Sequence, residues 1–173
     1  MRLLAWIVAI LVVAVAAFFV VGPGRVWQQI AGDPDTGPQS LETLERTGAP
    51  NDALLGPQDA LAVAPDGSTP VFQVPPAELF ATLLARIEET NEIRWVERDD
   101  DRLYAHGITA SPTLQFPDIN HIWVLPVATE DGEEPRSTLA LYAAAHLGQS
   151  DHGKNRERLD RWLTLLDDLP RAD

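Results

Sequence analysis

An unbroken apolar run near the N-terminus constrains this chain more than any other feature. Residues 3–21 are nineteen uncharged, almost wholly apolar residues, and Gly22-Pro23-Gly24 follows them. A helix of this length extends roughly 28 Å at about 1.5 Å per residue, which is close to the thickness of the hydrocarbon core of a bilayer. The run therefore predicts one membrane-spanning helix within residues 1–24.

A cleaved secretory signal peptide is the main alternative for this run. Such peptides have an apolar region of about 7 to 15 residues before a small-x-small cleavage site. Ala14-Val15-Ala16 fits that site, but the bulky residues 18–21 continue the run beyond it. A retained helix is therefore the favoured interpretation, and the absence of cysteine excludes a lipoprotein anchor.

Charge around the run indicates an orientation. Arg2 and the terminal amine precede the predicted helix and Arg25 follows it, so the positive-inside rule gives a slight preference for a cytoplasmic N-terminus. We therefore expect a single-pass protein whose C-terminal domain lies outside the cytoplasmic face of the membrane.

The rest of the chain is strongly acidic. All 26 acidic residues and 11 of the 13 basic residues lie beyond residue 25, which gives that part a formal charge of −15. Such a surface repels phosphate backbones and anionic lipid headgroups. We therefore expect no nucleic-acid partner, and the open alternatives are a protein partner in the envelope and a small ligand.

Residues 25–69 are expected to form a Pro/Gly-rich arm. Five prolines interrupt this segment, with glycines between them: Pro34, Pro38, Pro50, Pro57 and Pro65. No sustained hydrophobic period follows, so we expect an extended, partly ordered arm that links the anchor to the domain and could drape over it.

Residues 70–173 are expected to form a compact α+β domain. Strands are predicted at residues 71–74, 93–98, 102–109, 121–127 and 137–145, and helices of one-sided apolar pattern follow Pro75-Pro76 and span residues 151–169. The resulting order is β-α-β-β-β-β-α. Because short turns join the strands, the sheet of four to five strands should be antiparallel, with both helices on one face. A cavity between sheet and helices would admit an apolar ligand.

The segment before the last helix resembles a known signature. Its matching residues are Gly148, Ser150, Asp151, Gly153, Asn155, Arg156 and Arg158, and the pattern is similar to the S-x-S-R-x-G-x-S-D-x-G-x-N-R-x-R run of the bacterial family catalogued as domain of unknown function 1499. Phe116-Pro117-Asp118 resembles the preceding F-x-D element of that family, and Pro50-Asn51-Asp52 an upstream motif. Residues 143–146 depart from the pattern. The resemblance implies a fold and a bacterial context, but no activity. In that context the expected location is the bacterial inner membrane, crossed once, with the C-terminal domain in the periplasm.

The signature offers structural and binding roles. Ser150 or Asp151 could accept hydrogen bonds from the first turn of the last helix, where an acidic residue also suits the helix dipole. Arg156 and Arg158 are two residues apart and cannot share one face, so one should pair with Asp118 or Asp151 while the other meets solvent. A fixed arginine could instead bind a carboxylate or phosphate. The candidate binding residues are Asp118, Ser150, Asp151, Asn155, Arg156 and Arg158.

Catalytic and metal sites are weakly supported by the sequence. A hydrolase-like site would use Asp118, His146, Ser150 and Asp151, but Ser150 does not lie in a G-x-S-x-G turn. Asp118 and His121 should point to opposite faces of a strand, and the acidic runs 99–101 and 130–134 are typical of solvated loops. We therefore expect no catalytic residue, no metal and no cofactor.

The favoured hypothesis is accordingly a non-enzymatic, membrane-anchored domain that binds a protein partner or small ligand. The hydrolase-like enzyme and a structural spacer within a larger complex are the alternatives.

Overall fold

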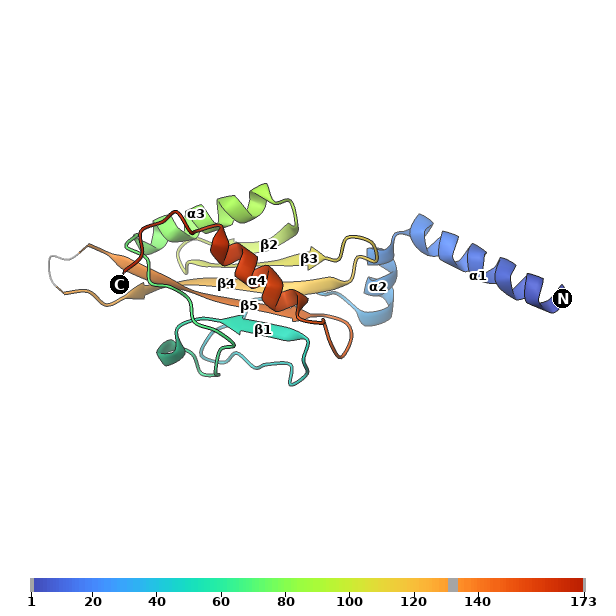
Figure 1. Ribbon diagram of the computed structural model, residues 1–173, viewed down its shortest axis with the longest axis horizontal. Helices are drawn as coiled ribbons and strands as arrows, with labels where there is room; N and C mark the ends of the chain where they lie inside the picture. The colour runs from blue at the N-terminus through green and yellow to red at the C-terminus, as the bar shows by residue number, and fades with distance from the viewer. Residues whose placement is uncertain (1, 131–133, 173) are drawn as a thin grey trace.

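A five-stranded antiparallel sheet forms the centre of the protein (Figure 1). The computed structural model describes residues 2–130 and 134–172. The strands are ordered β1-β5-β4-β3-β2 across the sheet. The elements are α1 (Arg2–Val21), α2 (Pro23–Ala31), β1 (Asp52–Leu55), η1 (Gln58–Ala60), α3 (Pro76–Glu89), β2 (Ile93–Asp99), β3 (Tyr104–Ala110), β4 (Pro117–Val127), β5 (Arg136–Ala145) and α4 (Lys154–Thr164). The predicted α+β class and antiparallel sheet are confirmed.

One face of the sheet packs against α3 and α4. Strand residues of alternating position supply the sheet side of this core, because successive side chains point to opposite faces: Ala105, Ile122, Val124, Leu139, Leu141 and Ala143. The helices contribute apolar stripes that include Leu83, Leu84, Leu159 and Trp162. Both helices therefore cover one face, as the sequence predicts.

The segment expected as an arm covers the other face. Leu41, Leu44, Leu61 and Val63 pack there against sheet residues that include Tyr104, Ile119, Trp123 and Tyr142. The same segment supplies the edge strand β1, in which Asp52 pairs with Ala144 and Leu55 with Leu141. Residues 25–69 thus pack on the sheet as well as linking it to α1, and they contain most of α2 and the strand β1, which were not predicted.

The first strand of the predicted order was placed in the wrong segment. Residues 71–74 form no strand, and Phe72 makes only isolated bridges with Ser137 and Arg171. The edge position beside β5 is taken by β1, whose four residues are too short to show an alternating pattern between Pro50 and Pro57. Pairing with β5, which is distant in sequence, decides the position of this strand.

Two other boundaries differ from the prediction. Strand β4 begins at Pro117, four residues before the predicted start, because a proline at the first position of a strand removes no essential ladder hydrogen bond. Helix α4 spans Lys154–Thr164, and the chain from Leu165 to Leu169 continues with tighter turns in which Leu166 and Leu169 donate to carbonyls three residues earlier.

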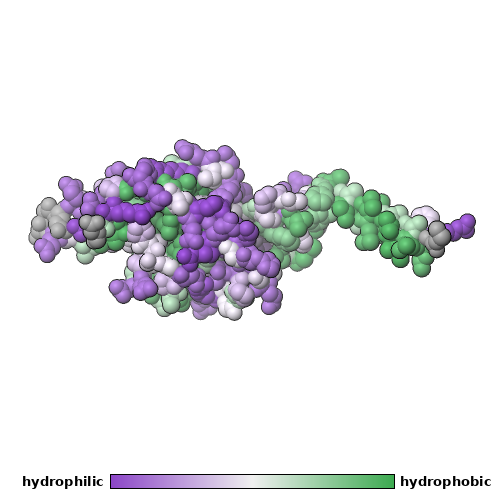
Figure 2. Space-filling view, in the orientation of Figure 1, coloured by the Kyte–Doolittle hydropathy of each residue, from purple (hydrophilic) through white to green (hydrophobic). Residues whose placement is uncertain are grey.

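Helix α1 projects from the domain (Figure 1), and none of its described side chains is buried. Its 20 residues are long and apolar enough to cross a bilayer. Figure 2 shows it as a hydrophobic rod beside a largely hydrophilic domain surface. Only Gly22 separates α1 from α2, with a φ of 96° that suits glycine, and Pro23 occupies the first turn of α2, where its missing N–H is tolerated.

Candidate functional site

The signature residues converge where β5 passes into α4, at the end of the domain that faces α1 (Figure 1). Asn51, just before β1, connects the parts. Its side-chain Nδ2 donates to the Gly148 carbonyl over 2.8 Å. Its own carbonyl accepts from the Ala145 amide over 2.9 Å and from Asn155 Nδ2 over 3.0 Å. The upstream motif and the signature quoted for the family resemblance are thus neighbours in space.

Arg158 lies at the centre of this network. Its Nη2 forms an ion pair with Asp118 Oδ2 over 2.6 Å, and the two side chains are only 10% and 12% exposed. Its Nη1 donates to Asn155 Oδ1 over 2.6 Å and to Asn120 Oδ1 over 3.3 Å. The ion pair expected for one of the two arginines is therefore made by Arg158.

Arg156 occupies the exposed side of α4. It pairs with Asp160 over 2.9 Å and donates from Nη1 to the Asp66 carbonyl over 2.9 Å. The sequence expectation that the second arginine meets solvent is confirmed, although this arginine also ties α4 to the loop after η1.

Asp118 is an unusual carboxyl group in this site. Its burial raises its pKa above the ordinary value, and the nearby Arg158 guanidinium opposes that rise without cancelling it. Asp118 thus combines a fixed cationic partner with a pKa set mainly by desolvation.

Asp151 organises the start of α4. Its Oδ2 accepts from the Asn155 amide over 2.7 Å, and its Oδ1 accepts from the Gly153 amide over 3.0 Å. Ser150 Oγ accepts from the His152 amide over 3.2 Å. Asp151 thus accepts from an N–H group in the first turn of the helix, which is the structural role expected from the sequence. Within the part of the chain that the structure describes, Ser150 accepts only from the loop before the helix.

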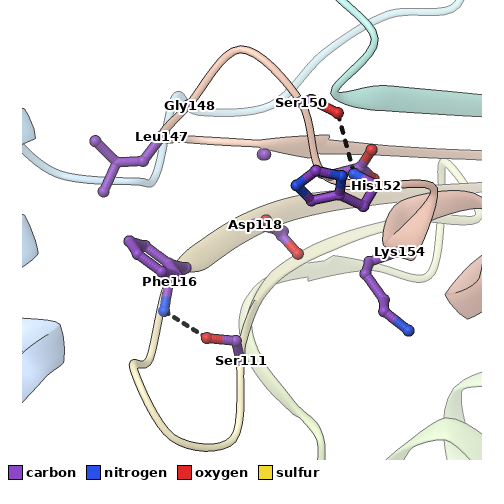
Figure 3. A pocket seen from close by; sticks show the side chains of 10 residues that line it. Ser111, Phe116, Asp118, Leu147, Gly148, Ser150, His152 and Lys154 are labelled. Carbon is purple, nitrogen blue, oxygen red and sulfur yellow. Dashed lines mark hydrogen bonds between the residues drawn. The ribbon is translucent and has the colours of Figure 1, made fainter.

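A pocket of about 340 Å³ lies among these residues (Figure 3). Its wall is formed by Ser111, Phe116, Asp118, Ala145, Leu147, Gly148, Ser150, Asp151, His152 and Lys154. Figure 3 shows the Asp118 side chain between Phe116 and Leu147 on one side and His152 and Lys154 on the other. The pocket lies at the end of the sheet, whereas apolar core residues pack between the sheet and the helices.

The structure does not bring together the four residues of the hydrolase-like alternative. Asp118, Ser150 and Asp151 line the pocket, but His146 is not on its wall. His146 Nε2 donates to the Ala31 carbonyl over 3.1 Å and thereby holds the end of α2. In the described residues, no hydrogen bond joins a histidine ring to Ser150 Oγ, which accepts only from the His152 amide.

His106 and His121 lie on the face of the sheet opposite to the pocket residue Asp118. His106 and His121 face each other across β3 and β4, and their rings stack at 5.5 Å. Both belong to the face that carries Tyr104 and Trp123, which is opposite to the face from which Asp118 reaches Arg158. Within residues 2–130 and 134–172, no cluster of three or more His, Cys, Asp or Glu side chains has metal-binding geometry.

The two acidic runs were expected to be solvated loops, and the structure describes only one of them in full. The 99–101 run lies at the turn after β2, where Asp99 pairs with Arg102 over 2.5 Å. The 130–134 run includes residues 131–133, which lie outside the described residues.

Sequence reasoning missed the contact between α2 and the pocket. The Trp27 ring stacks on Phe116 at 4.7 Å between centroids and makes an edge contact with Phe18 of α1 at 5.5 Å. Trp27 Nε1 also donates to the Leu114 carbonyl over 2.6 Å. Trp27 lies just past the glycine-proline break in an apparently irregular segment, but the proline that opens α2 was an available signal for this helix.

The comparison with protein families agrees with the placement of these motifs. A family model described as "Protein of unknown function (DUF1499)" matches residues 29–166, which include all the signature residues. No curated protein matches the chain.

Proposed function

The chain belongs to the DUF1499 family, and from the geometry of its own residues we propose that it is a membrane-anchored, non-enzymatic binding domain. One observation carries this proposal. A pocket remains open among the signature residues, while Asp151, Asn155 and Arg158 are engaged in structural hydrogen bonds. These hydrogen bonds keep the pocket in one conformation, which favours ligand binding, and the described residues of the site include no hydrogen-bonded pair of nucleophile and base.

The anchor in this proposal is α1. Its length, its apolar composition and its exposed side chains support a single membrane span. The slight excess of positive charge before it, Arg2 and the terminal amine against Arg25 after it, supports a domain on the outer side of the bacterial inner membrane, in the periplasm.

The pocket is held close to that anchor. Trp27 joins the end of α1 to the 111–116 loop through its contacts with Phe18, Leu114 and Phe116. Gly24 adds a hydrogen bond from its amide to Gln115 Oε1 over 3.0 Å. The pocket therefore lies at the bilayer surface and not at the end of a flexible tether.

Site-specific labelling tests this position. The chain has no cysteine, so single cysteines can be labelled with an environment-sensitive fluorophore in full-length protein reconstituted into vesicles. We expect the label on Leu114→Cys to be quenched by a lipid-borne quencher. The matched label on Asp101→Cys, at the turn between β2 and β3, should stay in water because β3 separates it from the 111–116 loop. Equal, weak quenching at both positions would disprove the proposed placement.

Activity assays test the non-enzymatic part. Full-length protein in detergent should not hydrolyse a library of generic esters, phosphates and glycosides above the level of a protein-free control. The hydrolase alternative draws support from the raised pKa of Asp118 at the pocket. It would replace our proposal if hydrolysis were found and were lost in Ser150→Ala while the fold, measured by circular dichroism, stayed intact.

A further inference from the structure

We propose that the pocket binds a membrane lipid with a zwitterionic headgroup, in which a phosphate and an ammonium group are joined, as in phosphatidylethanolamine. This inference rests on the proposed function, because it assigns an occupant to that same pocket. It follows from an apolar route towards the anchor, from the charges of the wall and from the size of the cavity.

The apolar route begins at α1. Phe116 forms part of the pocket wall and stacks on Trp27, which contacts Phe18 of the span. Leu114 and Phe116 are 41% and 37% exposed, and Ile30 of α2 is 67% exposed. Exposed apolar side chains that continue the surface of a span favour the bilayer interface, where aromatic rings also concentrate. A series of contacting apolar side chains therefore connects the span to the pocket wall, and a lipid chain can follow it.

The polar part of the wall suits a headgroup with both signs of charge. The Asp118 carboxylate uses Oδ2 for Arg158, and its second oxygen can accept from an ammonium group in the pocket (Figure 3). Lys154 stands at the wall with its ammonium on Glu157 Oε2 over 2.7 Å. Because that pair is exposed and of little strength, the Lys154 side chain can turn to a phosphate.

The net negative charge of the domain argues against lipids with anionic headgroups. The formal charge of −15 beyond residue 25 repels anionic lipids. Arg158, which lies outside the wall, compensates Asp118, and the wall itself also carries Asp151 and Lys154, which are of opposite sign. An added net charge of either sign would therefore be unbalanced. A zwitterionic headgroup adds no net charge.

The cavity size defines how much of the lipid enters. A volume of about 340 Å³ lies at the small end of ligand pockets, which range from about 300 to 1,000 Å³. It accommodates a headgroup and the first part of a chain between Phe116 and Leu147, with the remainder of the lipid in the bilayer.

Photo-crosslinking tests the proposal directly. Full-length protein is reconstituted into vesicles that contain phosphatidylethanolamine with a photoactivatable group near the glycerol, and the cross-linked peptides are identified by mass spectrometry. We expect cross-links to residues 111–118 and 146–154. Unlabelled phosphatidylethanolamine should compete, whereas phosphatidylglycerol and soluble phosphoethanolamine should not.

Pocket variants supply the control. Ala145→Leu fills the pocket and should reduce the cross-links at these residues about tenfold, whereas Ala81→Leu, on the exposed side of α3, should leave them unchanged. Leu147→Ser removes apolar wall without overpacking and serves if Ala145→Leu unfolds. Equal cross-linking in wild type and folded pocket variants would overturn the proposal.

The remaining outcomes separate this inference from the proposed function. Competition by soluble phosphoethanolamine would assign the pocket to a soluble ligand, which overturns the lipid inference and preserves a binding domain. Quenching at Leu114→Cys without pocket cross-links would also overturn the lipid inference, and it would leave the proposed position of the domain at the membrane unchanged. Absence of that quenching would instead remove the membrane-surface position on which both proposals depend.

Discussion

Arg158 is the residue on which the signature end of the domain depends. It is a nearly buried cation whose hydrogen bonds join β4 to α4. Removing one member of a buried ion pair leaves the other uncompensated, which costs about 3 to 5 kcal/mol. We therefore expect Asp118→Ala and Arg158→Met each to lower the free energy of unfolding by about 3 kcal/mol, measured by urea denaturation of the full-length chain in detergent.

The double variant tests the coupling between the two residues. Asp118→Ala/Arg158→Met should cost clearly less than the sum of the single changes, because no charge is left unpaired. Arg156→Met is the matched control on the same helix, and it should cost less than about 1 kcal/mol since its pair with Asp160 is exposed. An Arg158→Met effect no larger than that of Arg156→Met would contradict this account.

His121 gives the domain a dependence on pH. Its burial, together with the nearby His106, lowers its pKa to about 3, although Asp35 acts in the opposite direction. The unfolded chain takes up this proton near pH 6.5 and the folded chain does not, so stability falls as pH falls from about 6.5 towards 3. We expect the wild type to lose about 2 kcal/mol more than His121→Phe between pH 7 and pH 5.

The measurement is the melting temperature of both proteins across that range. The comparison with His121→Phe removes the contribution of other groups, such as Asp35 and Asp52, whose lowered pKa values also make stability fall in acid. Parallel pH profiles for the two proteins would show that His121 takes up its proton as readily in the folded protein as in the unfolded chain, and would contradict a lowered pKa.

At the scale of elements, the start of α4 is the place where stability and function can be separated. Asp151 accepts from the Gly153 and Asn155 amides, so Asp151→Ala should lower stability by about 1 kcal/mol, with a lower melting temperature as the readout. Asp160→Ala, in the exposed part of α4, is the control. An Asp151→Ala protein of unchanged stability that lost its ligand would show that this residue recognises the ligand and does not cap the helix.

The elements also show what local sequence patterns can predict. Helix α3 and strands β2, β3 and β5 were predicted within a few residues, because their apolar spacing is local and repeated. Neither β1 nor α2 was predicted. In the case of β1, the strand has only four residues and its pairing with β5 is decided by tertiary structure. The resemblance supplied the candidate site residues, but neither the pocket nor the stacking of Trp27 on Phe116 follows from spacing along the chain.

At the scale of the whole molecule, the protein joins an apolar rod to an acidic domain through a short, well-connected junction. Gly22 is the only residue between α1 and α2, and α2 is fixed by Trp27 on one side and by the His146 hydrogen bond to Ala31 on the other. The orientation of the domain is therefore coupled to the orientation of α1. If α1 spans a bilayer, the pocket must lie beside it.

A retained span makes a final prediction about the full-length chain. The protein should stay with membranes after washing with salt and with alkaline carbonate, and N-terminal sequencing should find residues 1–25 intact. Val12→Arg places a charge at the middle of α1, which costs about 2.5 to 3.5 kcal/mol on insertion scales, and it should move much of the protein into the washed fraction. Leu3→Arg, beside Arg2 at the membrane edge, should be tolerated. Wild-type protein recovered from the aqueous wash without its first 25 residues would show that the run is a cleaved signal peptide, and the pocket would then have no fixed relation to lipid.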